Sequence, residues 1–269
     1  WEALERKGIP FYNFGQANET AHVREEWMDT LTGGGHGVMV PMQKALYPRT
    51  SHNFAGFNMN IPDQYRMEQF ESYFTETWLS GKEELPPFIT AMLPNDHGSR
   101  VRPEDGYPYP HSFMADNDIA VGRMLHFLSR TPYWKNMLVI ITEDDPQGGV
   151  DHVDAHRSIL MMAGPYVKRG HVSHTHANFG SILKVIYNIL GVNYVNQYDV
   201  TASLLQDFFT DTPDFTPYTM VYPDKRIFDE QKAMSKYNRT IDWRKIEQGP
   251  KMDDADEQRE DHYKQKENK

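Results

Sequence analysis

The amino-acid sequence predicts an α/β fold, with a mostly parallel sheet flanked by helices. Short apolar runs typical of buried strands alternate along the chain with longer segments in which apolar residues recur at helical spacing. The chain has 269 residues, enough for a large hydrophobic core without disulfides or a structural metal. Its composition, with 39% hydrophobic and 25% charged residues, is that of a folded globular protein.

The N-terminal part of the chain is expected to contain two helices and a strand around a long loop. Residues 2–7 read as the end of a helix that Gly8 stops, and residues 9–14 alternate as a strand does. Residues 18–60 are rich in Gly, Pro, His and aromatic residues and lack sustained periodicity, which predicts an anchored loop. A helix follows over residues 63–80, with Asp63 as its N-cap and Gly81 as its stop.

Three further apolar runs, residues 87–93, 136–142 and 159–163, are predicted to be buried strands. Helices are expected over residues 115–130 and 181–190. Polar residues follow the first two of these strands directly. Because ligands bind at the carboxyl ends of parallel strands, these positions are candidates for a functional site.

The C-terminal segment differs in composition from the rest of the chain. Residues 229–269 carry many charges of both signs and few apolar side chains, which predicts a charged helical arm. We therefore divide the chain into a domain of residues 1–228 and an arm of residues 229–269.

Charge and composition exclude several classes of function. The net charge of −10 opposes nucleic-acid binding, and the absence of cysteine excludes disulfides and thiolate chemistry. No apolar run approaches the roughly 20 residues that a transmembrane helix needs. The chain begins at Trp1 without a signal segment, so we expect a fragment of a longer protein.

Acidic and imidazole side chains after the ends of two predicted strands form a candidate site for divalent metal ions. Carboxylates and imidazoles are ligands of Zn²⁺, Mn²⁺ and Fe, and two neighbouring ions need about five to eight such ligands between them. Gly148 and Gly149 allow the chain to turn back toward the same point. The candidate ligands are Asp96, His97, Asp144, Asp145, His152 and His156.

Each of these groups alone has a simpler explanation, because acids often cap helices and histidines often pack or cap. Their conjunction favours a metal site, and a structural Ca²⁺ site formed by the aspartates alone is the alternative.

Asp116, Asn117 and Asp118, at the start of a predicted helix, are interpreted as caps for that helix. The candidates for holding an anionic phosphate are Arg157, His174 and His176.

Three segments carry a resemblance to a known family. They are LPNDHG at residues 93–98, ADNDIAVGRML at 115–125 and ITEDDPQGGVDHVDAHRS at 141–158. In these segments the chain resembles the bacterial phosphoesterase family of the alkaline phosphatase superfamily, which includes phospholipase C-like and acid phosphatase-like enzymes. The resemblance extends more weakly to about Phe228 and is closest to members fused to an N-terminal β-propeller.

The resemblance implies a partial alkaline-phosphatase-like sandwich and metal-dependent hydrolysis of phosphate esters. It implies one or two divalent ions, with zinc favoured over manganese, iron or calcium. By position, Asp144 and Asp145 match paired metal ligands, Asp96 and His97 match ligands of the other metal, and His152 or His156 matches a late histidine. The chain departs from the superfamily pattern because Asp145 stands where many members have histidine, and because Asp96 and His97 are adjacent.

The nucleophile of the family lies upstream of the point that matches Trp1. The resemblance therefore implies that a missing N-terminal half of the same protein supplies it, with or without the β-propeller. The chain alone is then expected to be inactive. Because members of this family are usually exported, the resemblance further implies export to the periplasm, the cell surface or the medium.

Two other functions stay open on the sequence alone. One is a non-catalytic binding or assembly module that retains the phosphoesterase fold, which an upstream sequence without a Ser or Thr nucleophile would favour. The other is a phosphotransferase or sulfatase relative that uses the same metals, which substrate profiling would distinguish.

Overall fold

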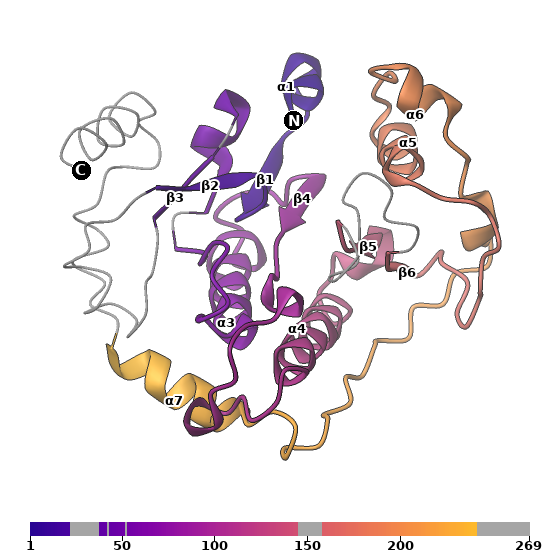
Figure 1. Ribbon diagram of the computed structural model, residues 1–269. Coiled ribbons are helices and arrows are strands. Elements are labelled where there is room, and N and C mark those ends of the chain that lie inside the picture. The colour runs from indigo at the N-terminus through magenta and orange to yellow at the C-terminus, as the bar shows by residue number, and fades with distance from the viewer. Residues whose placement is uncertain (22–37, 42, 52, 145–157, 241–269) are drawn as a thin grey trace. The chain divides into compact units, whose positions relative to one another are not determined.

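Helices and short strands alternate along the chain in the computed structural model (Figure 1). The structure describes residues 1–21, 38–41, 43–51, 53–144 and 158–240. The chain divides into two compact units, the first formed by Trp1–Arg123 with Val221–Lys269 and the second by Met124–Met220. In the described ranges, no helix combines the length and the apolar character needed to cross a membrane.

The first unit contains a parallel and an antiparallel pair of strands, and the candidate site follows a strand of the parallel pair. Strand β1 (Phe11–Phe14) pairs with β4 (Phe88–Ala91), with Phe11 opposite Phe88 and Phe14 opposite Ala91. Helix α1 (Glu2–Lys7) precedes β1 and ends at Gly8. These elements confirm the strands expected over residues 9–14 and 87–93, and the fold is of a coarse α/β class.

Helix α3 (Asp63–Tyr73) continues through the π-helical turn Phe74–Leu79, which confirms the helix predicted over residues 63–80. Its aromatic side chains Phe74 and Trp78 are buried in the core of the first unit, where their rings meet edge to face at 5.1 Å and Trp78 packs against the buried Phe14 of β1. The prediction that Asp63 is the N-cap is wrong. Pro62 is the N-cap, and Asp63 is the first helical residue, with its carboxylate turned toward other segments.

The segment expected as a long loop contains regular structure. Strands β2 (Asn18–Ala21) and β3 (Val38–Pro41) pair antiparallel, and a 3-10 helix spans Lys44–Arg49. The expectation of a loop over residues 18–60 was therefore wrong for these stretches, because strands of four residues are too short to show a periodic pattern.

Helix α4 (Ser112–Leu128) begins three residues before the predicted start, in the first unit, and ends in the second. Helix α7 (Glu230–Thr240) is the described start of the charged arm, and the rest of the arm lies outside the described residues. Met234 of α7 packs in a buried cluster with Ala55, Ile61 and Tyr65. This helix is therefore part of the core of the first unit, while the division at residue 228 stays a prediction.

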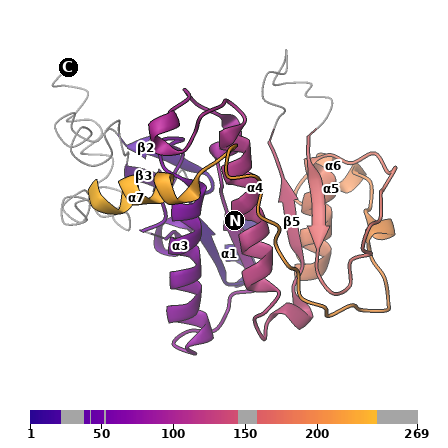
Figure 2. The ribbon, with the colours of Figure 1, turned by 90° about the horizontal axis from the view of Figure 1, so that it is seen from below.

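The second unit contains the predicted strands and helix of the later part of the chain. Strands β5 (Val139–Thr142) and β6 (Leu160–Ala163) pair antiparallel, and helices α5 (Phe179–Leu190) and α6 (Gln197–Thr201) pack side by side (Figure 2). Short 3-10 helices complete the two units at Asn95–His97, Pro103–Asp105, Trp134–Asn136 and Gln206–Phe208.

Two expectations about the strands need correction. Among the described strands, the β1–β4 pair is parallel and the other two pairs are antiparallel, so these strands do not form a mostly parallel sheet. The strands predicted as buried are only half-buried along β4 and partly exposed along β5 and β6. Apolar runs identify strands correctly, but they do not reveal which neighbour pairs with each strand.

Candidate metal site and its buried polar frame

Two of the candidate ligands lie in a turn at the carboxyl end of a parallel strand. Asp96 and His97 belong to the 3-10 helix Asn95–His97, which follows β4 directly. Asp96 is half-buried, and the exposed ring of His97 meets Phe57 edge to face at 5.3 Å. Gly98 ends the turn at φ +75°, a conformation that favours glycine. An acid and an imidazole are thus presented together where ligands bind in α/β folds.

The other candidate ligands lie elsewhere in the chain. Asp144 is exposed two residues after the end of β5, in the second unit, whereas Asp96 and His97 belong to the first. Within the described ranges, no three His, Asp or Glu side chains are grouped so as to hold a metal. The convergence of the predicted ligands therefore stays a prediction. Outside the described residues lie Asp145, His152, His156 and Arg157.

The histidines predicted to approach a phosphate lie on the surface of the second unit. His174 and His176 are exposed in the segment between β6 and α5. Nearby, His171 Nε2 lies 3.1 Å from Asp207 Oδ2. Hydrogen bonds from Ser173 and His171 hold the pKa of Asp207 below its usual range. The segment can present imidazoles to an anion, and the phosphate-binding role of His174 and His176 stays a prediction.

Asp116 is fully buried and caps a helix other than its own. Its carboxylate accepts hydrogen bonds from the backbone N–H groups of Asp63 at 2.9 Å and Gln64 at 3.4 Å, the first two residues of α3. The interpretation of Asp116 as a cap for its own helix is therefore wrong. Helix α4 already begins at Ser112, which places Asp116 beyond the first turn and leaves it free to neutralise the N-terminal end of α3.

The Asp116 carboxylate also binds three side chains. Tyr107 Oη donates at 2.7 Å, Asn95 Nδ2 at 2.6 Å and Gln64 Nε2 at 3.1 Å. Together with the two backbone N–H groups of α3, these donors use every lone pair that a carboxylate offers. Asp116 is consequently a structural anchor and has no lone pair left for a metal ion.

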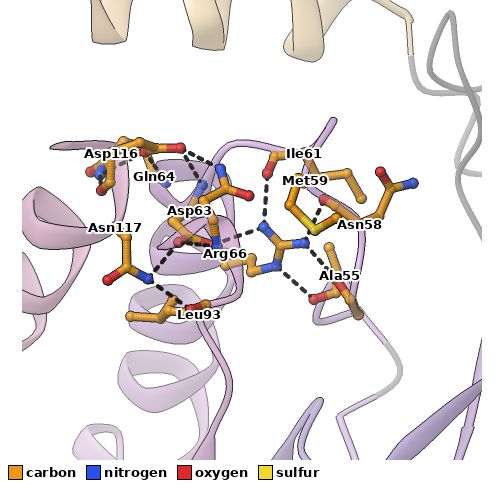
Figure 3. A network of polar contacts seen from close by, with 12 residues as sticks. Ala55, Asn58, Met59, Ile61, Asp63, Gln64, Arg66, Leu93, Asp116 and Asn117 are labelled. Carbon is orange, nitrogen blue, oxygen red and sulfur yellow. Dashed lines mark hydrogen bonds and ion pairs between the residues drawn. The ribbon is translucent and has the colours of Figure 1, made fainter. Parts of the chain in front are cut away.

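Asp63 and Asp116 belong to one network, which we call the buried polar frame; its other members are Gln64, Arg66, Asn95, Tyr107 and Asn117. Asp63 is the second buried carboxylate of this frame and connects three elements. It accepts hydrogen bonds from Arg66 Nη1 at 2.9 Å, from the backbone N–H of Asn95 at 3.1 Å and from Asn117 Nδ2 at 3.0 Å. Figure 3 shows Asp63 between Arg66 on one side and Asn117 on the other. Asn117 Nδ2 also donates to the Leu93 carbonyl at 2.7 Å. The frame therefore ties α3 and α4 to the turn that carries Asp96.

Arg66 compensates part of the buried negative charge. Its guanidinium is fully buried and, besides the ion pair with Asp63, donates to the backbone carbonyls of four residues: Ala55, Gly56, Asn58 and Ile61 (Figure 3). A guanidinium can satisfy so many acceptors because its five N–H donors lie in one plane. Arg66 thus anchors the loop before α3 and balances one of the two carboxylates.

Burial shifts the titration of both carboxylates of the frame. Burial raises the pKa of Asp63 to about 7, opposed by Arg66 and reinforced by Asp116. Burial also raises the pKa of Asp116, and the hydrogen bond from Tyr107 opposes that rise. One guanidinium faces two carboxylates, so we expect the frame to take up a proton near neutral pH.

The sequence alone did not identify Asp63, Asn95 and Asn117 as parts of the frame. The positions of the two aspartates on their helices nevertheless indicate that they are buried. Asp116 lies three and four residues before the buried Ile119 and Ala120, and therefore on the inward face of its helix. Asp63 stands in the same relation to the buried residues Arg66 and Met67. Charged side chains at inward-facing positions of helices indicate buried partners.

No protein-family model matches this chain, and a search of curated proteins also finds no match. The resemblance to the phosphoesterase family therefore rests on the sequence itself, chiefly on the three segments given above.

Proposed function

We propose that this chain is the metal-binding part of an exported phosphoesterase with an alkaline-phosphatase-like sandwich. The observation that carries the proposal is the turn after β4, in which Asp96 and His97 stand side by side at the carboxyl end of a parallel strand. The buried frame behind the turn supports the proposal, because a metal site needs ligands held in a fixed orientation.

The donor types fit a divalent ion. Carboxylates and imidazoles suit Zn²⁺ best, with Mn²⁺, Fe or Ca²⁺ as alternatives, and the proposed ligands are Asp96, His97, Asp144, Asp145, His152 and His156. A bound ion supplies positive charge that stabilises the attacking and leaving oxygens of a phosphate ester. The chain itself holds the ions, while Arg157, His174 and His176 orient the phosphate oxygens of the substrate.

The proposed reaction is a displacement at phosphorus. A hydroxyl from outside this chain loses its proton and forms a bond to phosphorus, while the bond from phosphorus to the leaving oxygen breaks and that oxygen takes up a proton. Water then attacks the phosphorylated intermediate, which releases phosphate and restores the hydroxyl. The residues of this chain bind and orient the ester, so the chain alone is expected to show no turnover.

The exposure of the strands supports a larger sandwich. Strands of a parallel α/β sheet are normally covered on both faces, yet β4, which pairs in parallel with β1, is only half-buried. In the antiparallel pair of β5 and β6, Met161 is 47% exposed, and Ile159, just before β6, is 43% exposed. We propose that a missing N-terminal half, with or without a β-propeller, contributes the elements that cover these strands and the nucleophile.

Metal analysis and phosphatase assays test the proposed function. The full-length protein is expected to contain zinc and to hydrolyse p-nitrophenyl phosphate or a phosphodiester analogue. Asp144→Asn should lower turnover more than about 100-fold. Replacing residues that only orient metal ligands already lowers metal affinity or activity about 10–100-fold, and the loss of a ligand itself should cost more. Asp118→Asn, an exposed position on α4, is the matched control and should behave as the wild type.

Equal turnover by the wild type and Asp144→Asn would remove the proposed role of that residue. A wild-type protein that binds phosphate esters without any turnover would instead indicate a non-catalytic binding module.

A further inference from the structure

Helix α7 docks on two parts of the first unit that the buried polar frame also holds. The first is the loop before α3, because the buried Met234 of α7 packs in one cluster with Ala55, Ile61 and Tyr65. Arg66 binds the carbonyls of the first two of these residues, Ala55 at 3.0 Å and Ile61 at 2.8 Å. The guanidinium of the frame therefore also shapes the surface that receives α7.

The second docking point is Tyr107. Its ring packs against Phe228, two residues before α7, with ring centroids 5.0 Å apart, and both side chains are buried. Tyr107 Oη donates to Asp116 at 2.7 Å. Directly before Tyr107, the Gly106 carbonyl accepts a hydrogen bond from the Asp229 N–H at 3.1 Å. The place at which α7 begins therefore depends on a ring that the frame holds.

The hydrogen bonds of the frame leave room for a proton on Asp63. The Asp116 carboxylate accepts from two backbone N–H groups and three side chains, which occupies its lone pairs. The Asp63 carboxylate has fewer donors, and its Oδ1 accepts one hydrogen bond, from Arg66. One guanidinium faces two fully buried carboxylates, so ionisation of both leaves an unbalanced negative charge in the core.

Other charged groups lie at the edges of the frame. Arg102 stands near it, and Asp105 Oδ2 lies 4.0 Å from Arg102 Nε, so this cation has an acid of its own. On the side of α7, Glu230 is close enough to Glu68 and Arg123 to interact with them electrostatically. Repulsion between these two glutamates is a second source of pH dependence, which a variant of Glu230 separates from the first.

We propose that the buried polar frame is a pH-sensitive latch for α7. With a proton on Asp63 the frame is neutral, and it holds Tyr107 and the loop of residues 55–61 where α7 docks. Loss of that proton leaves a charge that water stabilises better than the core does, so the frame opens toward solvent and α7 is released more often.

The sign of the effect follows from the titration of Asp63. Burial raises the pKa of Asp63 from 3.8 to about 7, so the docked state binds the proton more tightly than an open state does. The docked state therefore has its full advantage below the ordinary pKa of the carboxyl and loses it as the pH rises to about 7. Above about pH 7, docking should no longer change with pH.

Amide hydrogen exchange of residues 230–240 in the full-length protein tests the latch. Exchange is measured from about pH 5 to about pH 8 and expressed as protection relative to an unstructured peptide at the same pH. The protection of α7 should fall by up to about tenfold per pH unit as the pH rises to about 7, and then level off. Helix α5, in the second unit, is the internal control and should keep its protection.

Three variants identify the charge that is responsible. Asp63→Asn is neutral at every pH, and Asp116→Asn leaves Arg66 with a single carboxylate, so either variant should remove the pH dependence of α7. Glu230→Gln is the control, because it changes an acid of α7 and leaves the frame intact. It should retain the fall in protection toward pH 7. The urea midpoint establishes that each variant is folded, and if neither asparagine variant folds, the profiles of the wild type and Glu230→Gln decide.

A fall in protection that is confined to α7 and absent from the folded asparagine variants supports the latch. Protection of α7 that does not change with pH in the wild type overturns it. A fall that persists in the asparagine variants, or that Glu230→Gln removes, also overturns it, because the charge responsible would lie outside the frame. An equal fall in α5 would show unfolding of the whole chain and would overturn it as well.

Discussion

Arg66 is a buried cation whose donors all have acceptors. Its guanidinium joins the Asp63 carboxylate to backbone carbonyls of the loop before α3. Arg66→Met would leave two buried carboxylates without a cation and would free those carbonyls. Because removing one partner of a buried ion pair typically costs about 3–5 kcal/mol, we expect a loss of this size in the free energy of unfolding, measured with urea. Arg100→Met, at an exposed position, should change it by less than about 0.5 kcal/mol.

The titration of Asp63 gives a second prediction at the residue scale. Its pKa rises from 3.8 to about 7 in the folded protein, chiefly because of burial. Between these values the folded state binds more protons than the unfolded state, so the free energy of unfolding falls as the pH rises. The slope is at most about 1.4 kcal/mol per pH unit for one proton.

Urea unfolding of the wild type and of Asp63→Asn between pH 4 and 8 tests this effect. As the pH rises to about 7, the free energy of unfolding of the wild type should fall relative to that of Asp63→Asn. Above about pH 7 the difference between the two should stay constant. A relative stability that grows with pH would show that the folded protein favours the ionised Asp63. Asp118→Asn is the matched control, since the exposed Asp118 lies outside the frame.

Single residues show where sequence-based prediction succeeded and where it failed. Asp96 and His97 were correctly expected at the carboxyl end of a strand, because a short apolar run followed by polar residues identifies both the strand and its end. The partner of Asp116 could not be predicted. Asp63 and Asp116 are distant in sequence, and only the packing of α3 against α4 brings them together.

At the scale of elements, one of the contacts that attach α7 requires a glycine. Gly106 has φ +89°, its carbonyl accepts a hydrogen bond from the Asp229 N–H at 3.1 Å, and an added Cβ would overlap the Asp229 carbonyl oxygen. Gly106→Ala should therefore displace the start of α7 and destabilise the first unit. Gly81→Ala is the matched control, because Gly81 has φ +76° but open space around its Cβ position.

The two glycine variants separate backbone strain from steric overlap. Gly81→Ala should cost only the strain of a left-handed conformation, about 1–2 kcal/mol, whereas Gly106→Ala should cost more and should speed amide exchange in α7. If both variants lose the same free energy of unfolding in urea, and amide exchange in α7 is unchanged in Gly106→Ala, the close contact at Gly106 would be contradicted.

The prediction of elements was more accurate than the prediction of their pairing. Helical periodicity and glycine stops located α3, α4 and α5 to within a few residues. The antiparallel pairing of β5 and β6 differs from the prediction, because an alternation of strands and helices predicts parallel neighbours. Pairing depends on contacts between segments that no local pattern records.

At the scale of the whole molecule, the proposed function predicts that the six candidate ligands bind the same ion or two neighbouring ions. Asp96 and His97 belong to the first unit and Asp144 to the second, while the sequence from Asp145 to His156 supplies the remaining candidates. A bound divalent ion would then stabilise the folded protein. At ion concentrations well above the dissociation constant, the free energy of unfolding would rise with the logarithm of the ratio of the ion concentration to that constant.

Anomalous X-ray diffraction at the zinc edge, from crystals of the full-length protein grown with zinc, tests this convergence most directly. We expect a peak about 2.0–2.2 Å from the Asp96 carboxylate and the His97 imidazole, with Asp144 or its neighbours completing that site or an adjacent one. Well-ordered crystals without a zinc peak at Asp96, and with Asp144 remote from it, would contradict the account.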